Sequence, residues 1–196
     1  MKVIGIIGGI ASGKSRVSAE ILRRGARLVD ADRIGHDLLE TEPVKEKLRA
    51  RWGNAVFREG KVDRSLLAKA VFGPSGTEEL EALNKILHPK IVERVEKELA
   101  VCRARGDRLV LLDAPLLCET GLDRLCDGIV FVDADLSRRR ERAASRGWSA
   151  DELRRRESRQ IPLAEKRARA DLIIENNGPI ERIPPQIDLF FDRYNS

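Results

Sequence analysis

One short stretch near the N-terminus has the residue types and spacing to hold phosphate: Gly8–Ser15, which reads GGIASGKS. It follows an apolar, strand-like run, and a helical pattern begins at its end, which is the context that a phosphate-binding loop requires. Glycines let successive backbone N–H groups point inward at an anion, and the positive end of the helix dipole adds to them. The stretch therefore predicts a nucleoside triphosphate site.

Two side chains of this stretch have separate tasks. Lys14 would bring a mobile positive charge to the β and γ phosphates, and Ser15 would offer a hydroxyl group to Mg²⁺. The residues expected to bind the nucleotide here are Gly8, Gly9, Ile10, Ala11, Ser12, Gly13, Lys14, Ser15 and Arg16.

Two carboxylates close predicted strands, so they should emerge at the same sheet edge as the loop. A kinase must orient an acceptor hydroxyl and take its proton, and Asp32 is the candidate base. Asp113 is the candidate ligand of Mg²⁺, together with Ser15. For each carboxylate the alternative is a cap on the following turn. Asp30, two residues before Asp32, is set aside as the base.

Other nucleotide-binding classes lack support. A GTP-hydrolysing switch would carry glycine where Asp113-Ala114-Pro115 is followed by Leu116, and Asn84-Lys85 is not followed by the aspartate of a guanine-reading motif. A motor or helicase would need a larger core. The length of 196 residues favours a small-molecule kinase.

Five short apolar runs predict one parallel sheet with helices on both faces, a three-layer α/β/α fold: 2–7, 27–32, 109–117, 128–133 and 171–175. One helix is expected over Lys14–Arg24, ending at Gly25. Another is expected to begin at Pro89, cover Lys90–Arg105 and end at Gly106.

Two intervals interrupt the alternation of strands and helices. Residues 33–105 show helical patterns and no convincing strand, which predicts a helical substrate subdomain. Residues 145–169 are helical, polar and rich in arginine, which suits a mobile lid. The nucleotide-binding core is then expected at 1–32, 106–144 and 170–196.

Positive charge is concentrated near that lid. Between Arg138 and Arg169 there are twelve basic and five acidic residues, although the net charge of the whole chain is only +5. The partner is expected to be anionic: nucleotide phosphates or, alternatively, a nucleic-acid backbone. Against nucleic acid, the segment holds a single aromatic residue, Trp148, on which a base could stack. We therefore expect no nucleic-acid partner.

Composition places the chain among soluble globular proteins, with 42% hydrophobic and 35% charged residues. The apolar runs are too short to span a bilayer, so no membrane partner is expected. Cys102, Cys118 and Cys126 have no metal-ligand spacing and indicate free thiols in a reducing cytoplasm. We expect a cytoplasmic monomer.

Several motifs along the chain together resemble the dephospho-coenzyme A kinase family, in that family's order and from residue 4 to about 178. Besides the loop these are Asp30-Ala31-Asp32, Asp63-Arg64, His88-Pro89, Pro115-Leu116-Leu117-x-Glu119 and Ala170-Asp171-x-Ile173-Ile174-x-Asn176. The resemblance implies transfer of the γ phosphate of ATP to the ribose 3′-hydroxyl of dephospho-coenzyme A, the last step of coenzyme A synthesis. Another P-loop nucleotide or sugar kinase is the alternative.

The resemblance also implies roles for single residues. Asp32 would be the base, Arg142 and Arg146 would meet the ATP phosphates, and Arg156 with Gln160 would form a second lid pair. Asn176 and Gly178 would lie beside the adenine. The substrate contacts would be Asp32, Arg64, His88, Leu116 and Glu119. For His88, which stands alone before a proline, a structural role is the alternative.

Two positions depart from the family pattern, which usually has threonine at both. Ile7 removes a hydroxyl near the acceptor, and Arg16 puts a cation in the first turn of a helix, where the dipole disfavours it by ~0.3–1 kcal/mol. Bound phosphates could offset that cost. Both departures concern affinity rather than the reaction.

Overall fold

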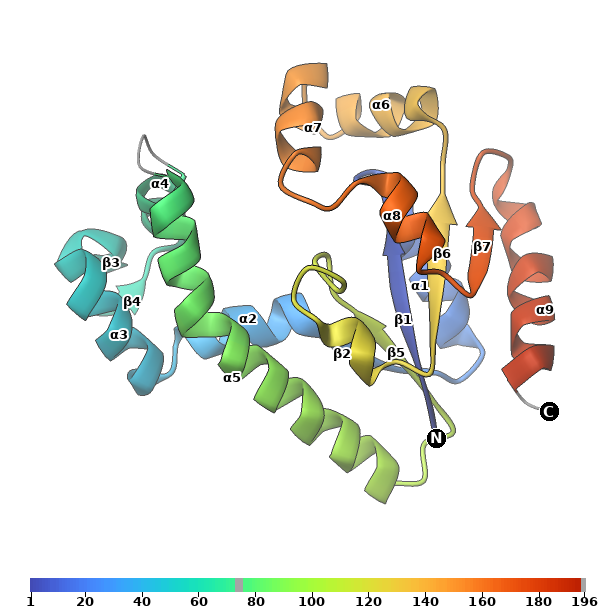
Figure 1. Cartoon of the computed structure of the whole chain (residues 1–196), viewed down its shortest axis with the longest axis horizontal. Coiled ribbons are helices and arrows are strands. Elements are labelled where there is room, and N and C mark those ends of the chain that lie inside the picture. The colour runs from blue at the N-terminus through green and yellow to red at the C-terminus, as the bar shows by residue number, and fades with distance from the viewer. Residues whose placement is uncertain (73–75, 195–196) are drawn as a thin grey trace. The chain divides into compact units, whose positions relative to one another are not determined.

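The computed structural model describes residues 1–72 and 76–194. The chain forms two compact units (Figure 1). The first unit joins Met1–Asp30 to Leu99–Ser196, and the second is Ala31–Glu98.

The first unit is built on a parallel sheet in the strand order β2-β5-β1-β6-β7. Its interior strands are buried along almost their whole length, because helices cover both faces. The predicted five-stranded parallel sheet is confirmed. The strands are β1 (Lys2–Gly8), β2 (Arg27–Asp30), β5 (Leu109–Asp113), β6 (Gly128–Asp133) and β7 (Leu172–Glu175).

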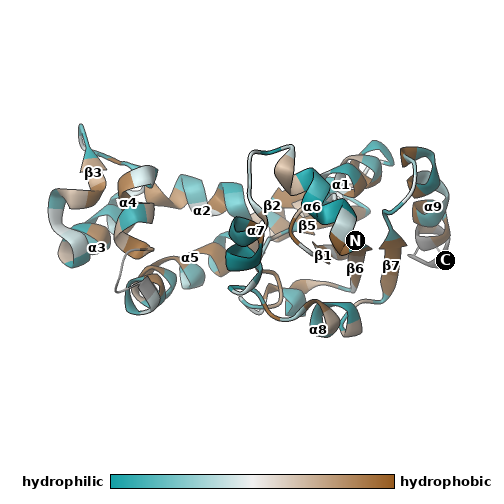
Figure 2. Cartoon of the chain, turned by 90° about the horizontal axis from the view of Figure 1, so that it is seen from above, coloured by the Kyte–Doolittle hydropathy of each residue, from teal (hydrophilic) through white to brown (hydrophobic). Residues whose placement is uncertain are grey.

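Helices α1 (Lys14–Arg23) and α9 (Ile183–Tyr194) pack against each other on one face of the sheet. Helix α8 (Leu163–Ala168) packs on β1 at the other face, as Figures 1 and 2 show together. The core between α1, α9 and the sheet is apolar and includes Ile4, Ile6, Val17, Ile21, Leu111, Val130, Val132, Ile174, Ile183 and Ile187. The remaining elements of this unit are α6 (Leu136–Ala144), α7 (Ala150–Glu157) and the 3₁₀ turns η2 (Leu122–Leu125) and η3 (Ile180–Arg182).

The second unit has its own apolar core, which is centred on Val44, Leu48, Val56, Leu67 and Val71. It contains α2 (Ala31–Leu39), α3 (Glu42–Trp52), η1 (Gly53–Val56), β3 (Phe57–Arg58), β4 (Lys61–Val62), α4 (Arg64–Val71) and most of α5 (Gly76–Ala104).

The expectation of no strand between 33 and 105 was wrong, because β3 and β4 pair as an antiparallel hairpin. Each strand is only two residues long, so the alternation was too short to recognise. The turn between them has positive φ at Glu59 (51°) and Gly60 (77°), which is the geometry of a tight two-residue hairpin.

The helix expected to begin at Pro89 also differs, since α5 begins at Gly76 and Pro89 lies inside it. The proline removes only its own N–H from the helix ladder, and the turns before it are held by packing of Leu80, Leu83 and Leu87 on the second core. The predicted helix ends are confirmed. Gly25 and Gly106 each follow a helix, and both glycines have positive φ, 91° and 79° respectively.

Two strand predictions ran too far. The run at 27–32 ends as a strand at Asp30, and α2 begins at Ala31, so Asp32 lies in the first turn of a helix. A carboxylate there is favoured by the helix dipole. The run at 109–117 ends as a strand at Asp113.

Candidate nucleotide-binding site

The phosphate-binding loop leaves the central strand β1 and enters α1 at Lys14. The amide of Ser12 donates to the carbonyl of Gly9 at 3.0 Å, and Ala11 has a left-handed backbone with φ of 60°. Such a conformation costs an alanine about 1–2 kcal/mol, so the surroundings must hold it. The loop therefore lies at the positive end of the α1 dipole, in a shape that residues with a side chain rarely adopt.

Asn176, at the end of β7, braces the loop from the side. Its amide nitrogen Nδ2 donates to the carbonyl of Ser12 at 2.7 Å, and the residue is only 2% exposed. A Cβ atom at Gly13, where φ is 94°, would collide with that nitrogen. Position 13 thus requires glycine both for its backbone and for its closeness to Asn176.

Arg142 of α6 holds the same part of the loop. One guanidinium nitrogen donates to the carbonyl of Ser12 and another to the carbonyl of Asn176, both at 2.8 Å. Burial lowers the pKa of Arg142, and the nearby positive charges of Arg16 and Arg138 lower it further. A group of cations beside a phosphate-binding loop is suited to a polyanion. Arg142 therefore supports the loop backbone directly.

Arg139 is a second loop-side arginine, and no sequence motif singled it out. It is 6% exposed, donates from Nε to the carbonyl of Ala134 at 3.1 Å, and forms an ion pair with Glu157 of α7. A Cβ atom at Gly9 would lie 3.1 Å from its Cδ, so the side chain lies against the loop. In the sequence it was only one of the twelve basic residues between Arg138 and Arg169.

Asp113 lies at the carboxyl edge of β5, and its Cα partners are Asp30 of β2 and Ile6 of β1. Its Oδ2 accepts a hydrogen bond from Ser18 of α1 at 3.3 Å. Ser15 lies one turn before Ser18 on that helix, so the hydroxyl of Ser15 and the carboxylate of Asp113 both lie at this end of α1. These hard oxygen donors fit Mg²⁺.

No group of three or more His, Cys, Asp or Glu side chains suited to a metal ion occurs within residues 1–72 and 76–194. A magnesium ion at Ser15 and Asp113 would thus draw most of its ligands from phosphate oxygens and water, as Mg²⁺ commonly does in kinases.

Glu119, in the segment after β5, contacts helix α8 and the residues just before it. Its Oε1 lies 3.0 Å from Nζ of Lys166 in α8 and accepts from the amide of Ile161 at 3.0 Å. Lys166 is 1% exposed and also donates to Oε1 of Gln160 at 2.9 Å. A charged lysine this deeply buried needs such partners. Leu116, three residues before Glu119, is half-buried.

Comparison with known proteins agrees with this geometry. A family model described as dephospho-CoA kinase matches residues 2–182. The chain belongs to the dephospho-CoA kinase family. A dephospho-CoA kinase of Symbiobacterium thermophilum is 40% identical over 192 residues, covering 96% of this chain and 79% of that protein. One from Corynebacterium efficiens is 37% identical and covers 94% and 93% of the two chains.

Solved structures agree with the fold. A protein from Thermus thermophilus is 34% identical with a TM-score of 0.82, covering 98% of this chain and 97% of the other. A shikimate kinase from Acinetobacter baumannii, 14% identical with a TM-score of 0.53, covers 100% and 95% and shares the fold alone. The predicted family, the P-loop kinase fold and the assignment as an enzyme are confirmed.

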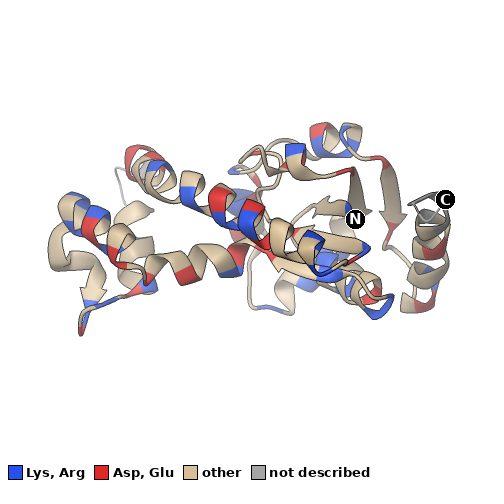
Figure 3. Ribbon diagram, turned by 90° about the horizontal axis from the view of Figure 1, so that it is seen from below, with Lys and Arg blue, Asp and Glu red and all other residues tan. Residues whose placement is uncertain are grey.

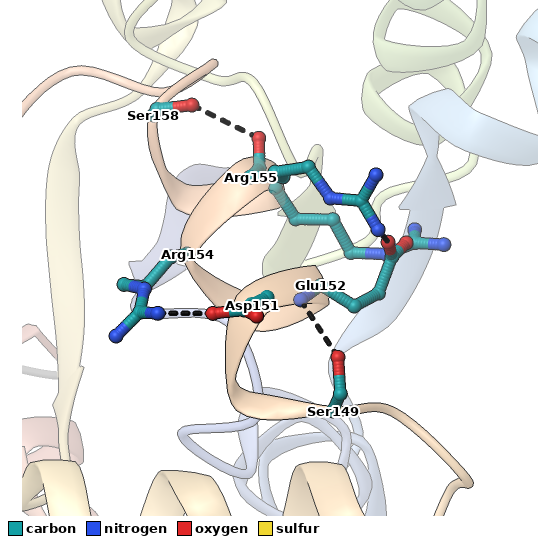
Figure 4. A network of polar contacts seen from close by, with 7 residues as sticks. Ser149, Asp151, Glu152, Arg154, Arg155 and Ser158 are labelled. Carbon is teal, nitrogen blue, oxygen red and sulfur yellow. Dashed lines mark hydrogen bonds and ion pairs between the residues drawn. The ribbon is translucent and has the colours of Figure 1, made fainter.

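In this dephospho-CoA kinase family member, the segment expected to be a lid carries its own charge balance. Ser149 caps α7, its Oγ accepting from the amide of Glu152 at 3.1 Å (Figure 4). The arginines of α7 pair with acidic residues of the same helix: Arg154 with Asp151, and Arg155 and Arg156 with Glu152. Acidic and basic residues likewise alternate along many helices of the chain (Figure 3). Part of the positive surplus is therefore neutralised locally.

The other predicted substrate residues belong to the second unit. Asp32 is exposed in the first turn of α2. Arg64 begins α4 after the cap Asp63, and a guanidinium nitrogen lies 2.8 Å from Nε2 of His36. The structure thus pairs Arg64 with a histidine that carried no motif in the sequence.

His88 borders a shallow pocket on α5, which is also lined by Glu81, Asn84, Lys85 and Pro89. Burial lowers the pKa of His88. A neutral imidazole in such a place can accept a hydrogen bond, so both the structural and the substrate-binding interpretations of His88 stay predictions.

No helix in the described parts of the chain has the length and apolar character that crossing a membrane requires.

Proposed function

We propose that this protein transfers the γ-phosphoryl group of ATP to the ribose 3′-hydroxyl of dephospho-coenzyme A, giving coenzyme A and ADP. The observation that carries the proposal is the phosphate-binding loop, which Asn176 and Arg142 hold by hydrogen bonds to the carbonyl of Ser12 in a member of the dephospho-CoA kinase family. Because its amides are fixed before ATP binds, the loop loses little conformational freedom on binding.

In the proposed reaction the 3′-oxygen attacks the γ phosphorus while the bond to the β–γ bridging oxygen breaks, leaving ADP. The carboxylate of Asp32 takes the proton of the 3′-hydroxyl. Lys14, Arg142 and Arg146 supply positive charge to the phosphates, which matters most where negative charge moves during transfer.

Magnesium would be held by Ser15 and Asp113. When bound, the ion would neutralise phosphate charge and orient the γ-phosphoryl group. The hydrogen bond from Ser18 to Asp113 supports this by fixing the carboxylate next to α1. Ser15 and Asp113 would thus act together, and removing either should raise the Mg²⁺ concentration that half of the maximal rate requires.

Other assignments follow the family pattern. Asn176 and Gly178 would border the adenine, and Arg64, His88, Leu116 and Glu119 would contact dephospho-coenzyme A. Residues 33–105 would form the substrate subdomain and 145–169 the lid, between core segments 1–32, 106–144 and 170–196. Three free cysteines support a reducing cytoplasm, and we propose a monomer that binds neither nucleic acid nor membrane.

Product analysis tests the reaction. The protein is incubated with ATP, Mg²⁺ and dephospho-coenzyme A, with adenosine, shikimate and a hexose as competing acceptors, and the products are identified by mass spectrometry. We expect a single added phosphate, on the ribose of dephospho-coenzyme A. Phosphate on a competing acceptor at a comparable rate would contradict the proposed substrate.

A pair of substitutions tests the base. Asp32→Asn should leave ATP binding intact and lower kcat by about 10²–10⁴, because an amide cannot accept the hydroxyl proton. Asp30→Asn is the matched comparison, since Asp30 is two residues away and lies beside Asp113 in the sheet. If Asp32→Asn keeps more than a tenth of the turnover while Asp30→Asn does not, Asp30 is the base.

A further inference from the structure

Trp148 connects the segment expected to be a lid with the phosphate-binding loop inside the first unit. Gly147, with φ of 78°, turns the chain after α6, and the amide of Trp148 donates to the carbonyl of Ala143 at 3.0 Å. This turn places the indole ring in a small apolar cluster. The cluster consists of Ala11, Ala143 and Leu153, with Ile10 and Trp148 packed against them.

Two of these cluster residues are loop residues, and one of them is strained. Ala11 is the alanine with the left-handed backbone, and its buried side chain lies in the apolar cluster. Burial of its methyl group helps to offset the cost of that conformation. The indole ring therefore packs in the same cluster as the part of the loop whose shape depends most on its surroundings.

Two arginines lie over the same indole ring. The guanidinium carbon of Arg156 lies 4.3 Å from the centre of the indole, and that of Arg146 lies 5.9 Å away. Arg156 is held at a second point, since its Nε donates to Oε1 of Glu152 at 2.8 Å. Its side chain is still 44% exposed. A cation over an indole face is attracted by the ring quadrupole.

We propose that Trp148 is a positioning residue, which places the guanidinium of Arg156, and more weakly that of Arg146, for contact with the phosphates of the bound nucleotide. The ring makes two kinds of contact at once. It packs in one cluster with Ile10 and Ala11, and it holds Arg156 over one of its faces. The guanidinium of Arg156 thus lies on a ring that packs in the same cluster as the loop residues, so its position depends on the folded loop. The inference rests on the proposed kinase function.

The test compares two substitutions of the ring. Trp148→Leu keeps an apolar side chain in the cluster but removes the aromatic face, whereas Trp148→Phe keeps a smaller face. We expect Trp148→Leu to lower kcat about three- to tenfold, with an unchanged KM for dephospho-coenzyme A, and Trp148→Phe to restore most of the loss. Equal rates for both variants and the wild type would overturn the proposal, as would equal losses in both.

A double-mutant cycle separates positioning from packing. Arg156→Ala alone should lower kcat more than Trp148→Leu alone, and Trp148→Leu should have almost no further effect on kcat in the Arg156→Ala background. If Trp148→Leu lowers kcat by the same factor in both backgrounds, the ring does not act through Arg156. If Arg156→Ala leaves turnover unchanged, the assignment of the lid arginines fails, while the product assay still reports on the reaction itself.

Fluorescence gives a second readout. The chain has two tryptophans, so Trp52→Phe, a change in the core of the second unit, leaves Trp148 as the single reporter. A non-hydrolysable ATP analogue should change the emission of Trp148 in this variant. The change should be smaller when Arg156 is also replaced by alanine. An emission spectrum that does not respond to saturating analogue would contradict a ring in contact with the nucleotide-dependent part of the protein.

Discussion

Removing the side chain that braces the phosphate-binding loop should weaken ATP binding more than it weakens the fold. In Asn176→Ala the Nδ2 donor to the carbonyl of Ser12 is lost. This donor is buried, and its hydrogen bond is short at 2.7 Å. The carbonyl of Ser12 is not left without a donor, because Arg142 still bonds to it at 2.8 Å. We therefore expect a loss of about 1–1.5 kcal/mol, the net value of a single good hydrogen bond, and not the larger cost of a buried unsatisfied group.

That free energy should be expressed mainly in nucleotide affinity, because the bond orders the loop that receives the phosphates. A loss of about 1–1.5 kcal/mol corresponds to a Kd for ATP roughly five- to twelvefold higher. Calorimetric titration with a non-hydrolysable ATP analogue measures it, and urea unfolding measures the stability of the same variant.

Asn177→Ala is the matched control. Asn177 is the next residue and of the same type, and its Oδ1 accepts from the amide of Asp135 at 2.7 Å, a bond that does not involve the loop. Asn177→Ala should lose a comparable free energy, but in the stability of the fold, and should keep its affinity for the analogue. If both variants bind the analogue equally, the bond from Asn176 does not order the loop and the reasoning is refuted.

Two further predictions concern Arg16 and His88. Arg16→Thr should change kcat/KM for ATP by less than about tenfold, because the backbone N–H at this position remains; a loss beyond about a hundredfold in steady-state kinetics would show a direct role for the guanidinium. His88 has a pKa lowered by burial, so the folded protein favours its neutral form. Its contribution to stability is therefore present above the ordinary histidine pKa and is lost as the pH falls below about 6.5. Between about pH 7.5 and about pH 5.5, urea unfolding should show a larger loss of stability in the wild type than in His88→Gln. Equal losses in the two proteins would exclude protonation of a buried His88 as the cause of the pH dependence.

The parts of the fold that were predictable from the sequence are those that depend on local patterns. Continuous apolar runs such as Gly128–Asp133 predicted buried parallel strands, and Gly25 and Gly106 predicted where two helices end. The start of α5 was missed because Pro89 is a strong helix-start signal, and packing of the preceding turns on the second core outweighs it.

The structure of the candidate site was less predictable, because its contacts join distant segments. Arg139 and Arg142 occur in one basic run, yet one is nearly buried against Gly9 and both bond to backbone carbonyls. Helical periodicity could place them on α6, but only the tertiary packing decides which arginine faces the loop. The strand position predicted for Asp32 was wrong for a similar reason, since an apolar run does not reveal where a strand gives way to a helix.

The buried ion pair between Glu119 and Lys166 has a consequence for how this chain can change over evolutionary time. Replacing either partner alone leaves a desolvated charge, which typically costs about 3–5 kcal/mol and would remove a large share of a domain's stability. Replacing both together by apolar residues of similar size avoids that penalty. Related sequences are therefore expected to vary at these two positions jointly, because a change at either position alone leaves the other charge without its partner.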